Sequence, residues 1–245
     1  GRNDMAAVLT DETLVHAKQV TKVYHTGEVD TYALRGIDLE VKAGDFLAIV
    51  GPSGSGKTTL LNLIGALDNI TDGTLEVLGS DVSRMSRRQR ADLRLHALGF
   101  IFQAYNLFPV LTAQENVQFV LELQGVNNER GRRAREVLDR LGLGEYANRR
   151  PPQMSGGQQQ RVAVARAVAS KPRLVLADEP TANLDGENAG ILLDMMRDLN
   201  ENQHTTFIFS THDPRVVAYA RRVVTLVDGQ VAKDIVKESD AHDAG

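Results

Sequence analysis

The sequence predicts an α/β protein with a mainly parallel sheet, into which a helical segment is inserted. Short apolar runs rich in β-branched residues alternate with helix-like patterns, as strands and crossover helices do in parallel sheets. Between residues 104 and 164 the strand-like runs stop and helix signals dominate. The chain has 245 residues, of which 42% are hydrophobic, and this is enough for one domain with a sizeable core.

Eight segments have the length and composition expected of strands. They are residues 15–24, 37–41, 46–50, 74–78, 100–102, 174–178, 206–210 and 223–227. Helices are expected over residues 57–67 and after three capping boxes, in which a Ser or Thr hydroxyl and a Glu or Gln three residues later satisfy free N–H groups. These pairs are Ser86 with Gln89, Thr112 with Glu115, and Ser155 with Gln158.

The domain organisation follows from these elements. We expect one domain over residues 5–245, with an α/β core of residues 5–103 and 165–236 around a helical subdomain of residues 104–164. The ends, residues 5–12 and 237–245, are short polar tails, and residues 1–4 resemble an expression-vector remnant before Met5.

Composition excludes several classes of function. The net charge of −4 argues against a general nucleic-acid binder, and we expect no nucleic-acid partner. The absence of cysteine excludes disulfides and thiolate metal sites, and it is compatible with a cytosolic protein. No run approaches the roughly 18 apolar residues of a membrane helix.

A phosphate-binding loop follows the expected strand at residues 46–50. Residues 51–58, Gly-Pro-Ser-Gly-Ser-Gly-Lys-Thr, match the pattern G-x-x-x-x-G-K-[ST] known as Walker A. Its backbone N–H groups and the following helix N-terminus are suited to bind phosphates, with Lys57 reaching the β- and γ-phosphates and Thr58 binding Mg²⁺. The alternative is a glycine-rich turn before a helix. The expected ligand residues are Gly51, Ser53, Gly54, Ser55, Gly56, Lys57, Thr58 and Thr59.

A second signal is the apolar run at residues 174–178, which ends in two acids. Asp178 at the carboxyl end of a strand would lie at the ligand-binding edge of such a sheet and hold Mg²⁺. Glu179 would orient or deprotonate an attacking water. The alternative is a pair of solvated acids at a strand end.

The third signal is Ser155-Gly156-Gly157, directly before a strong helix pattern. A capping box explains Ser155, but it does not explain two glycines in the first helical turn, which cost about 1 kcal/mol each relative to alanine. Close approach of an anion to bare backbone at the helix N-terminus would explain them.

These motifs, in this order, resemble the ATP-binding cassette (ABC) family over about residues 13–236. Residues 154–158 resemble its signature, usually Leu-Ser-Gly-Gly-Gln, with Met154 replacing the leucine. The resemblance implies a P-loop NTPase core with a mainly parallel sheet, an antiparallel β subdomain and a helical signature subdomain. It implies ATP and Mg²⁺ as cofactors and a head-to-tail homodimer, formed on ATP binding, in which each signature caps the ATP bound by the partner subunit.

Further residue roles are implied only by this resemblance. Gln103 is similar to the Q-loop glutamine that contacts Mg²⁺, and Asp185 to the D-loop aspartate at the dimer interface. His212 is similar to the switch histidine that contacts the γ-phosphate, so that Lys57, Glu179 and His212 form the expected catalytic set. Tyr24 is similar to the aromatic residue that stacks on adenine, although a lone aromatic in an early strand also suits edge packing.

Two arginine clusters have two possible interpretations. Solvated helix faces with acidic partners one turn away are the simpler explanation. Proximity to anionic lipid headgroups or acidic partner loops is the alternative. The clusters are Arg84, Arg87, Arg88, Arg90 and Arg94, and Arg130, Arg132, Arg133 and Arg135.

The resemblance therefore implies the ATPase subunit of an ABC transporter on the inner face of the cell membrane, bound to a separate transmembrane permease. Residues 24–36 and 150–157 resemble the macrolide-exporter and lipoprotein-release branch, which exports or extracts lipophilic substrates. The alternative is an ABC ATPase that transmits mechanical force through a membrane partner without transport, as in cell division.

Overall fold

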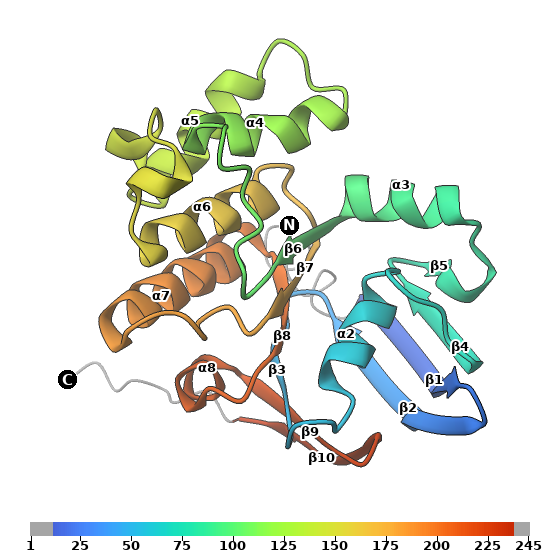
Figure 1. The fold of residues 1–245 in the computed structure, drawn as a ribbon. Helices are drawn as coiled ribbons and strands as arrows, with labels where there is room; N and C mark the ends of the chain where they lie inside the picture. The colour runs from blue at the N-terminus through green and yellow to red at the C-terminus, as the bar shows by residue number, and fades with distance from the viewer. Residues whose placement is uncertain (1–11, 238–245) are drawn as a thin grey trace, which may run out of the picture.

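Two sheets and a set of helices make up residues 12–237, the part of the chain that this computed structural model describes (Figure 1). The strands are β1 (Thr13–Thr26), β2 (Val29–Lys42), β3 (Phe46–Val50), β4 (Asp72–Val77), β5 (Ser80–Asp81), β6 (Leu98–Ile101), β7 (Leu174–Asp178), β8 (Thr206–Ser210), β9 (Arg222–Val227) and β10 (Gln230–Val236). The helices are α2 (Lys57–Ile64), α3 (Arg87–Ala97), α4 (Ala113–Leu123), α5 (Arg130–Arg140), α6 (Gly156–Val168), α7 (Gly186–Gln203) and α8 (Pro214–Tyr219), with short 3₁₀ turns at Val82–Arg84, Gly144–Tyr146 and Pro151–Gln153. The expected vector remnant and most of the two polar tails lie outside the described residues.

The larger sheet is mainly parallel, which confirms the predicted fold class. Its strand order is β10-β9-β3-β8-β7-β6, and only β10 runs antiparallel to its neighbour. Alternate residues of β7 enter different cores: Val175 and Ala177 belong to one buried cluster, and Leu174 and Leu176 to the other. Both faces of the strand are therefore buried, which explains its continuous apolar run.

The smaller sheet is antiparallel, with the order β2-β1-β4-β5. Its inner side chains share one buried cluster with α2 and one face of the larger sheet; Val15, Leu34, Leu60 and Ile208 are members. The antiparallel β subdomain implied by the family resemblance is therefore present, and α2 lies between the two sheets (Figure 1).

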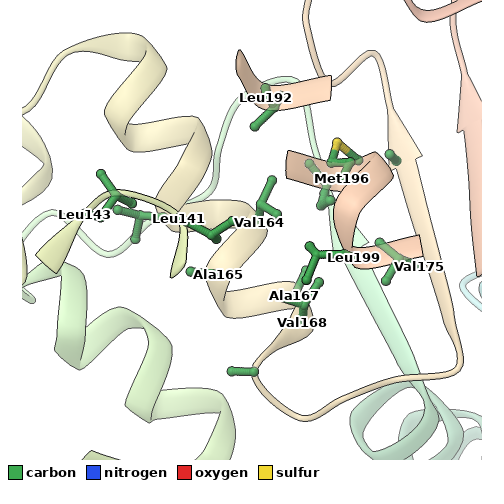
Figure 2. Packing of buried hydrophobic residues seen from close by; sticks show 14 of the residues in the cluster. Leu141, Leu143, Val164, Ala165, Ala167, Val168, Val175, Leu192, Met196 and Leu199 are labelled. Atoms are coloured by element: carbon green, nitrogen blue, oxygen red, sulfur yellow. The ribbon is translucent and has the colours of Figure 1, made fainter. Parts of the chain in front are cut away.

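Helices α4, α5 and α6 form the helical part of the molecule, and no strand occurs between residues 104 and 169. The three capping boxes are present at α3, α4 and α6. Figure 2 shows how α6 residues such as Val164 pack against α7 residues such as Met196 and against Val175 of β7. Helix α6 runs without a break through residues 164 and 165, so the expected boundary between subdomain and core falls inside one helix.

The structure differs from the predicted elements mainly at their ends. Helix α2 stops at Ile64 rather than residue 67, because Gly65 caps it and Ala66 adopts a left-handed φ of 54°. Strand β2 begins at Val29, eight residues before the predicted start, and residues 29–32 are exposed. Strands β5 and β10 were not predicted; β10 is a largely exposed edge strand without a buried apolar face.

Within residues 12–237, none of the helices combines the length and the apolar character needed to cross a membrane.

Candidate functional site

The phosphate loop, residues 51–58, joins β3 to α2 and is held in shape by its backbone. Gly56 caps α2 with a left-handed φ of 100°, and a Cβ at this position would lie 2.6 Å from the carbonyl oxygen of Ala33. No side chain caps the first turn of α2. Its free N–H groups and the positive end of the helix are therefore available to an anion.

Lys57 occupies the first position of α2 and reaches back over the loop. Its Nζ donates to the carbonyl oxygens of Gly51 at 2.6 Å and Pro52 at 3.2 Å. The ammonium group therefore lies against the loop backbone. Its partners are neutral carbonyl oxygens, which a phosphate oxygen could replace.

A cavity of about 770 Å³ opens above this loop. Ten of the expected site residues line it: Tyr24, Gly51, Ser53, Gly54, Gly56, Lys57, Thr58, Thr59, Glu179 and His212. Thr31, Tyr32, Ala33 and Pro52 complete the lining and were not identified from the sequence. Ser55 is buried within the loop, where its hydroxyl has no hydrogen-bond partner among the described residues.

Asp178 ends β7 beside the phosphate loop. Burial raises the pKa of its carboxyl and the negative charge of Glu179 adds to this effect, whereas Ser210, Thr58 and Lys57 oppose it. One carboxylate oxygen, Oδ1, is buried and has no hydrogen-bond partner among residues 12–237. An unsatisfied buried carboxylate oxygen is costly and is a suitable ligand for a cation.

The donor set fits Mg²⁺ held together with phosphates. In residues 12–237 no group of three or more His, Cys, Asp or Glu side chains is arranged to hold a metal by itself. Mg²⁺ is usually bound by one or two protein oxygens together with substrate phosphates and water. The orphaned Asp178 oxygen and the Thr58 hydroxyl fit this pattern.

Glu179 and His212 face each other across the ends of β7 and β8. The Oε1 atom of Glu179 is 2.7 Å from Nδ1 of His212 and accepts the His212 backbone N–H at 3.2 Å. The Thr211 hydroxyl donates to Oε2 at 3.2 Å. The Glu179 side chain is only 16% exposed, whereas that of His212 is 76% exposed, so the carboxylate is fixed while the imidazole is open to a ligand.

The backbone of Glu179 is strained. Its φ of 46° lies in the left-handed region, which costs a non-glycine residue about 1–3 kcal/mol. The N–H of Glu179 donates to the carbonyl oxygen of Ser210 at 2.8 Å, which fixes this conformation. The chain thereby turns the carboxylate toward His212 immediately after the strand, a feature that the sequence does not reveal.

The loop that carries His212 is tied to the segment after Glu179 by Asp213. The Thr181 hydroxyl donates to Asp213 Oδ2 at 2.5 Å, and Arg215 forms an ion pair with it at 2.7 Å. Burial opposes ionisation of Asp213, but the hydrogen bonds from Arg215 and Thr181 outweigh it and lower its pKa to about 2. The pairing of the Asp213 and Thr181 segments was not identified from the sequence.

Two tyrosines, Tyr24 and Tyr32, also line the cavity. The Tyr24 hydroxyl donates to Asp68 Oδ2 at 3.1 Å, and Nζ of Lys22 lies 4.9 Å from the centre of its ring. Tyr32, on the neighbouring strand, lies under the guanidinium of Arg35. Tyr32 was not identified because its half of β2 gave no strand signal.

The other expected site residues do not line this cavity. Gln103 is exposed in the turn after β6, and its carbonyl oxygen accepts from Asn183 at 3.1 Å. Ser155 is exposed at the N-terminus of α6, and Asp185 is exposed at the N-terminus of α7. Within one chain the cavity therefore gathers only part of the expected nucleotide contacts.

The structure gives Gly157 a packing reason that the sequence did not show. A Cβ there would lie 2.4 Å from Oδ1 of Asn188, whose amide donates to Asp185. Gly156 has more room, since a Cβ would lie 3.0 Å from the Tyr105 hydroxyl. Contact with α7 therefore accounts for the second glycine without an anion.

The arginine cluster on α5 agrees with the solvated-face explanation, because each member has an acidic partner. Its ion pairs involve Glu122, Glu129, Glu136 and Asp139. The cluster around α3 is different: Arg84 pairs with Asp81, but Arg90 and Arg94 bond to the side-chain oxygen of Asn69 and the backbone of Ala66.

Comparison with known proteins identifies relatives of this chain. A family model described as ABC transporter matches residues 34–182. The macrolide export ATP-binding/permease protein MacB of Syntrophobacter fumaroxidans is 47% identical over 221 residues, which are 89% of this chain and 31% of that protein. The lipoprotein-releasing system ATP-binding protein LolD 1 of Rhodopseudomonas palustris is also 47% identical, over 87% of this chain and 96% of that protein. The chain therefore spans about a third of the first relative and nearly all of the second.

A solved structure shares the fold. The dimeric post-hydrolysis state of the ATP-binding cassette MJ0796, bound to ADP and Pi, superposes with a TM-score of 0.84 at 40% sequence identity. The match covers 91% of this chain and 99% of that chain.

Proposed function

The chain belongs to the ABC transporter family and is an ATP-binding ATPase, and we propose that it drives a separate membrane permease that exports or extracts a lipophilic substrate. The assignment of ATP hydrolysis rests on one observation: the phosphate loop, Glu179 and His212 line the same cavity. The relatives named for macrolide export and lipoprotein release support the choice of transport class.

In this proposal the phosphate loop binds the triphosphate. The backbone of residues 51–56 and the N-terminus of α2 surround the phosphates, Lys57 exchanges its carbonyl partners for the β- and γ-phosphates, and Tyr24 stacks on the adenine. Thr58 and Asp178 would hold Mg²⁺, which would neutralise phosphate charge. Gln103 joins them if the segment after β6 moves toward the cavity.

Glu179 is the proposed general base. Thr211 and His212 hold its carboxylate in place. A carboxylate oxygen of Glu179 can then polarise a water that is aligned with the γ-phosphate. The exposed His212 ring is free to contact the γ-phosphate oxygens. Lys57 supplies positive charge on the same side.

Two copies of the chain complete the site in this proposal. Ser155, Gly156, Gly157 and Asp185 lie outside the cavity of their own chain, and the solved relative is a dimer. A head-to-tail pair would bring the signature of each subunit to the ATP of the other. The dimer would form on ATP binding and separate after hydrolysis.

An apolar groove of about 420 Å³ between α3, β6, α4 and α6 is the proposed contact with the permease. Phe100 and Phe119 line it, and Phe119 is 37% exposed. Arg94 and Arg166 also line it, and burial lowers the pKa of both. An amphipathic helix of a membrane subunit, with apolar side chains and a carboxylate, would satisfy this surface. The chain would then lie on the inner face of the cell membrane.

Co-purification with a membrane subunit, followed by reconstitution in vesicles, tests this proposal. ATP-dependent movement of a lipophilic reporter across or out of the bilayer is the expected result. ATPase activity that requires the membrane subunit but moves no solute would favour the mechanical alternative. Stimulation of the ATPase by nucleic acid alone would contradict both.

A further inference from the structure

Four contacts link Tyr24, which lines the nucleotide cavity, with Lys22, Asp68 and Asn69. Lys22 Nζ forms an ion pair with Asp68 Oδ1 at 2.9 Å and also donates to the carbonyl oxygen of Asn69 at 2.7 Å. The other carboxylate oxygen, Oδ2, accepts from the Tyr24 hydroxyl at 3.1 Å. Nζ of Lys22 lies 4.9 Å from the centre of the Tyr24 ring. Asp68 therefore binds both the tyrosine and the cation that covers the ring.

The burial of these groups indicates that the arrangement is fixed. Lys22 is only 9% exposed, which is rare for a lysine without a function or a close partner. Burial opposes ionisation of Asp68, but the bonds from Lys22, Asn69 and Tyr24 outweigh it and lower its pKa. The carboxylate is therefore charged at neutral pH. Tyr24 itself remains 40% exposed and lines the cavity.

The position of Asp68 in the chain connects the ring to the phosphate loop. Helix α2 begins at Lys57 in that loop and ends at Ile64, four residues before Asp68. Lys22 and Tyr24 lie two residues apart on β1, so their side chains leave the same face of the strand. The contacts with Asp68 thus tie β1 to the far end of the phosphate-binding helix.

An ion pair between Lys22 and Asp68 alone would be a structural link between β1 and the loop after α2. Such a link does not require an aromatic neighbour. Here the second carboxylate oxygen binds the phenol and the ammonium group covers the ring, while Tyr24 remains 40% exposed in the lining of the cavity. A cation on one face draws π-electron density toward itself and makes the opposite face a better surface for an electron-rich purine.

We propose that Lys22 and Asp68 are positioning residues that hold Tyr24 as a platform for the nucleotide base, at a fixed separation from the phosphate loop. This inference rests on the proposed nucleotide site. It extends that site by two charged residues that touch neither phosphate nor metal. Their effect on binding should therefore require a ligand that has a base.

The experiment compares ATP with tripolyphosphate, which has the phosphates but no base. Calorimetric titrations use the Glu179→Gln background, so that ATP is not consumed. Asp68→Asn and Lys22→Met should each weaken ATP binding by about fivefold, since part of the stacking of the base on the Tyr24 ring is lost. Both should leave the affinity for tripolyphosphate unchanged.

Two further variants control for folding and for position. Tyr24→Phe removes only an exposed hydroxyl, and it should weaken ATP binding in the same direction without unfolding the chain. Asp72→Asn changes an exposed carboxylate in the same part of the chain, whose Oδ1 accepts its neighbour's N–H, and should have no effect. In a Tyr24→Ala background, Asp68→Asn should cause no further loss of ATP affinity.

Equal weakening of ATP and tripolyphosphate by Asp68→Asn would overturn the inference, because Asp68 would then support only the phosphate loop. Unchanged ATP affinity in both Asp68→Asn and Tyr24→Phe would overturn it too. If Tyr24→Ala has no effect but Lys57→Ala still abolishes binding, the base platform fails while the phosphate site stands. If neither ATP nor tripolyphosphate binds to the Glu179→Gln protein without further substitutions, the proposed function itself fails.

Discussion

Replacement of Glu179 by glutamine isolates the charge of one carboxylate in an otherwise unchanged site. The side chain is 16% exposed and accepts from His212 at 2.7 Å and from Thr211 at 3.2 Å. A glutamine oxygen can keep the contact with His212, and the Thr211 hydroxyl can turn to accept from the new amide. We therefore expect the melting temperature to stay the same.

The loss should fall on hydrolysis. A positioned general base contributes about 10²–10⁴ in rate, so turnover should decrease by that factor. ATP affinity should be equal or higher, because Glu179→Gln removes a negative charge close to three phosphates. The variant should accumulate as an ATP-bound dimer, which light scattering with and without ATP would detect.

Steady-state phosphate release is the assay, with Glu145→Gln as a matched control on an exposed acid in the helical part of the molecule. The control should hydrolyse ATP at the wild-type rate. Wild-type turnover in Glu179→Gln would refute the general-base role, and Asp185 or His212 would be tested next. The same mass with and without ATP would refute the proposed dimer.

Four further variants probe the other expected site residues. Lys57→Ala should lower ATP affinity or turnover at least tenfold, about 1.4 kcal/mol, while circular dichroism stays unchanged. Asp178→Asn should weaken Mg²⁺-dependent ATP binding, yet the nucleotide-free chain should melt no lower than wild type. Burial raises the folded-state pKa of Asp178, so the wild type loses stability as the pH rises from about 4 through that folded-state pKa. Asparagine cannot ionise, so melting curves over this pH range should show Asp178→Asn gaining stability relative to the wild type. Gly157→Ala should destabilise the chain by about 1–3 kcal/mol in denaturant unfolding, since the new Cβ would lie 2.4 Å from Asn188 Oδ1, whereas Gly156→Ala should cost less.

The sequence predicted the parts of the fold in which local pattern and burial agree. The strands at residues 46–50, 174–178 and 206–210 have the predicted bounds because their side chains are buried on both faces of the sheet. Residues 29–32 of β2 are exposed, so their pairing with β1 depends on backbone hydrogen bonds that leave no hydrophobic signal. Tyr32 was missed for the same reason.

The candidate site was predictable where a motif is contiguous. Residues 51–59, except the buried Ser55, line one cavity because the loop wraps its own backbone, and that geometry is local. The contacts of Glu179 with His212 and of Thr181 with Asp213 join segments more than 30 residues apart, which are adjacent only because β7 pairs with β8. The left-handed backbone of Glu179 depends on the same pairing, and a glutamate carries no local preference for it.

Gly157 shows how a sequence argument can select an important residue for an incomplete reason. Two glycines in a first helical turn suggested an anion, but within one chain the second glycine is required by α7. Asn188 fills the space where a side chain would be and also donates to Asp185 at the start of α7. The N-termini of α6 and α7 therefore pack through one asparagine side chain.

A substitution at Gly157 would disturb Asp185 as well as Ser155, so a loss of ATPase activity in that variant would not by itself demonstrate a phosphate contact. Ser155→Ala tests that contact more directly, because the Ser155 hydroxyl caps α6 by accepting the Gln158 N–H. Its loss should cost about 1 kcal/mol of stability, and any larger effect on ATP-dependent dimerisation would report on the partner's nucleotide.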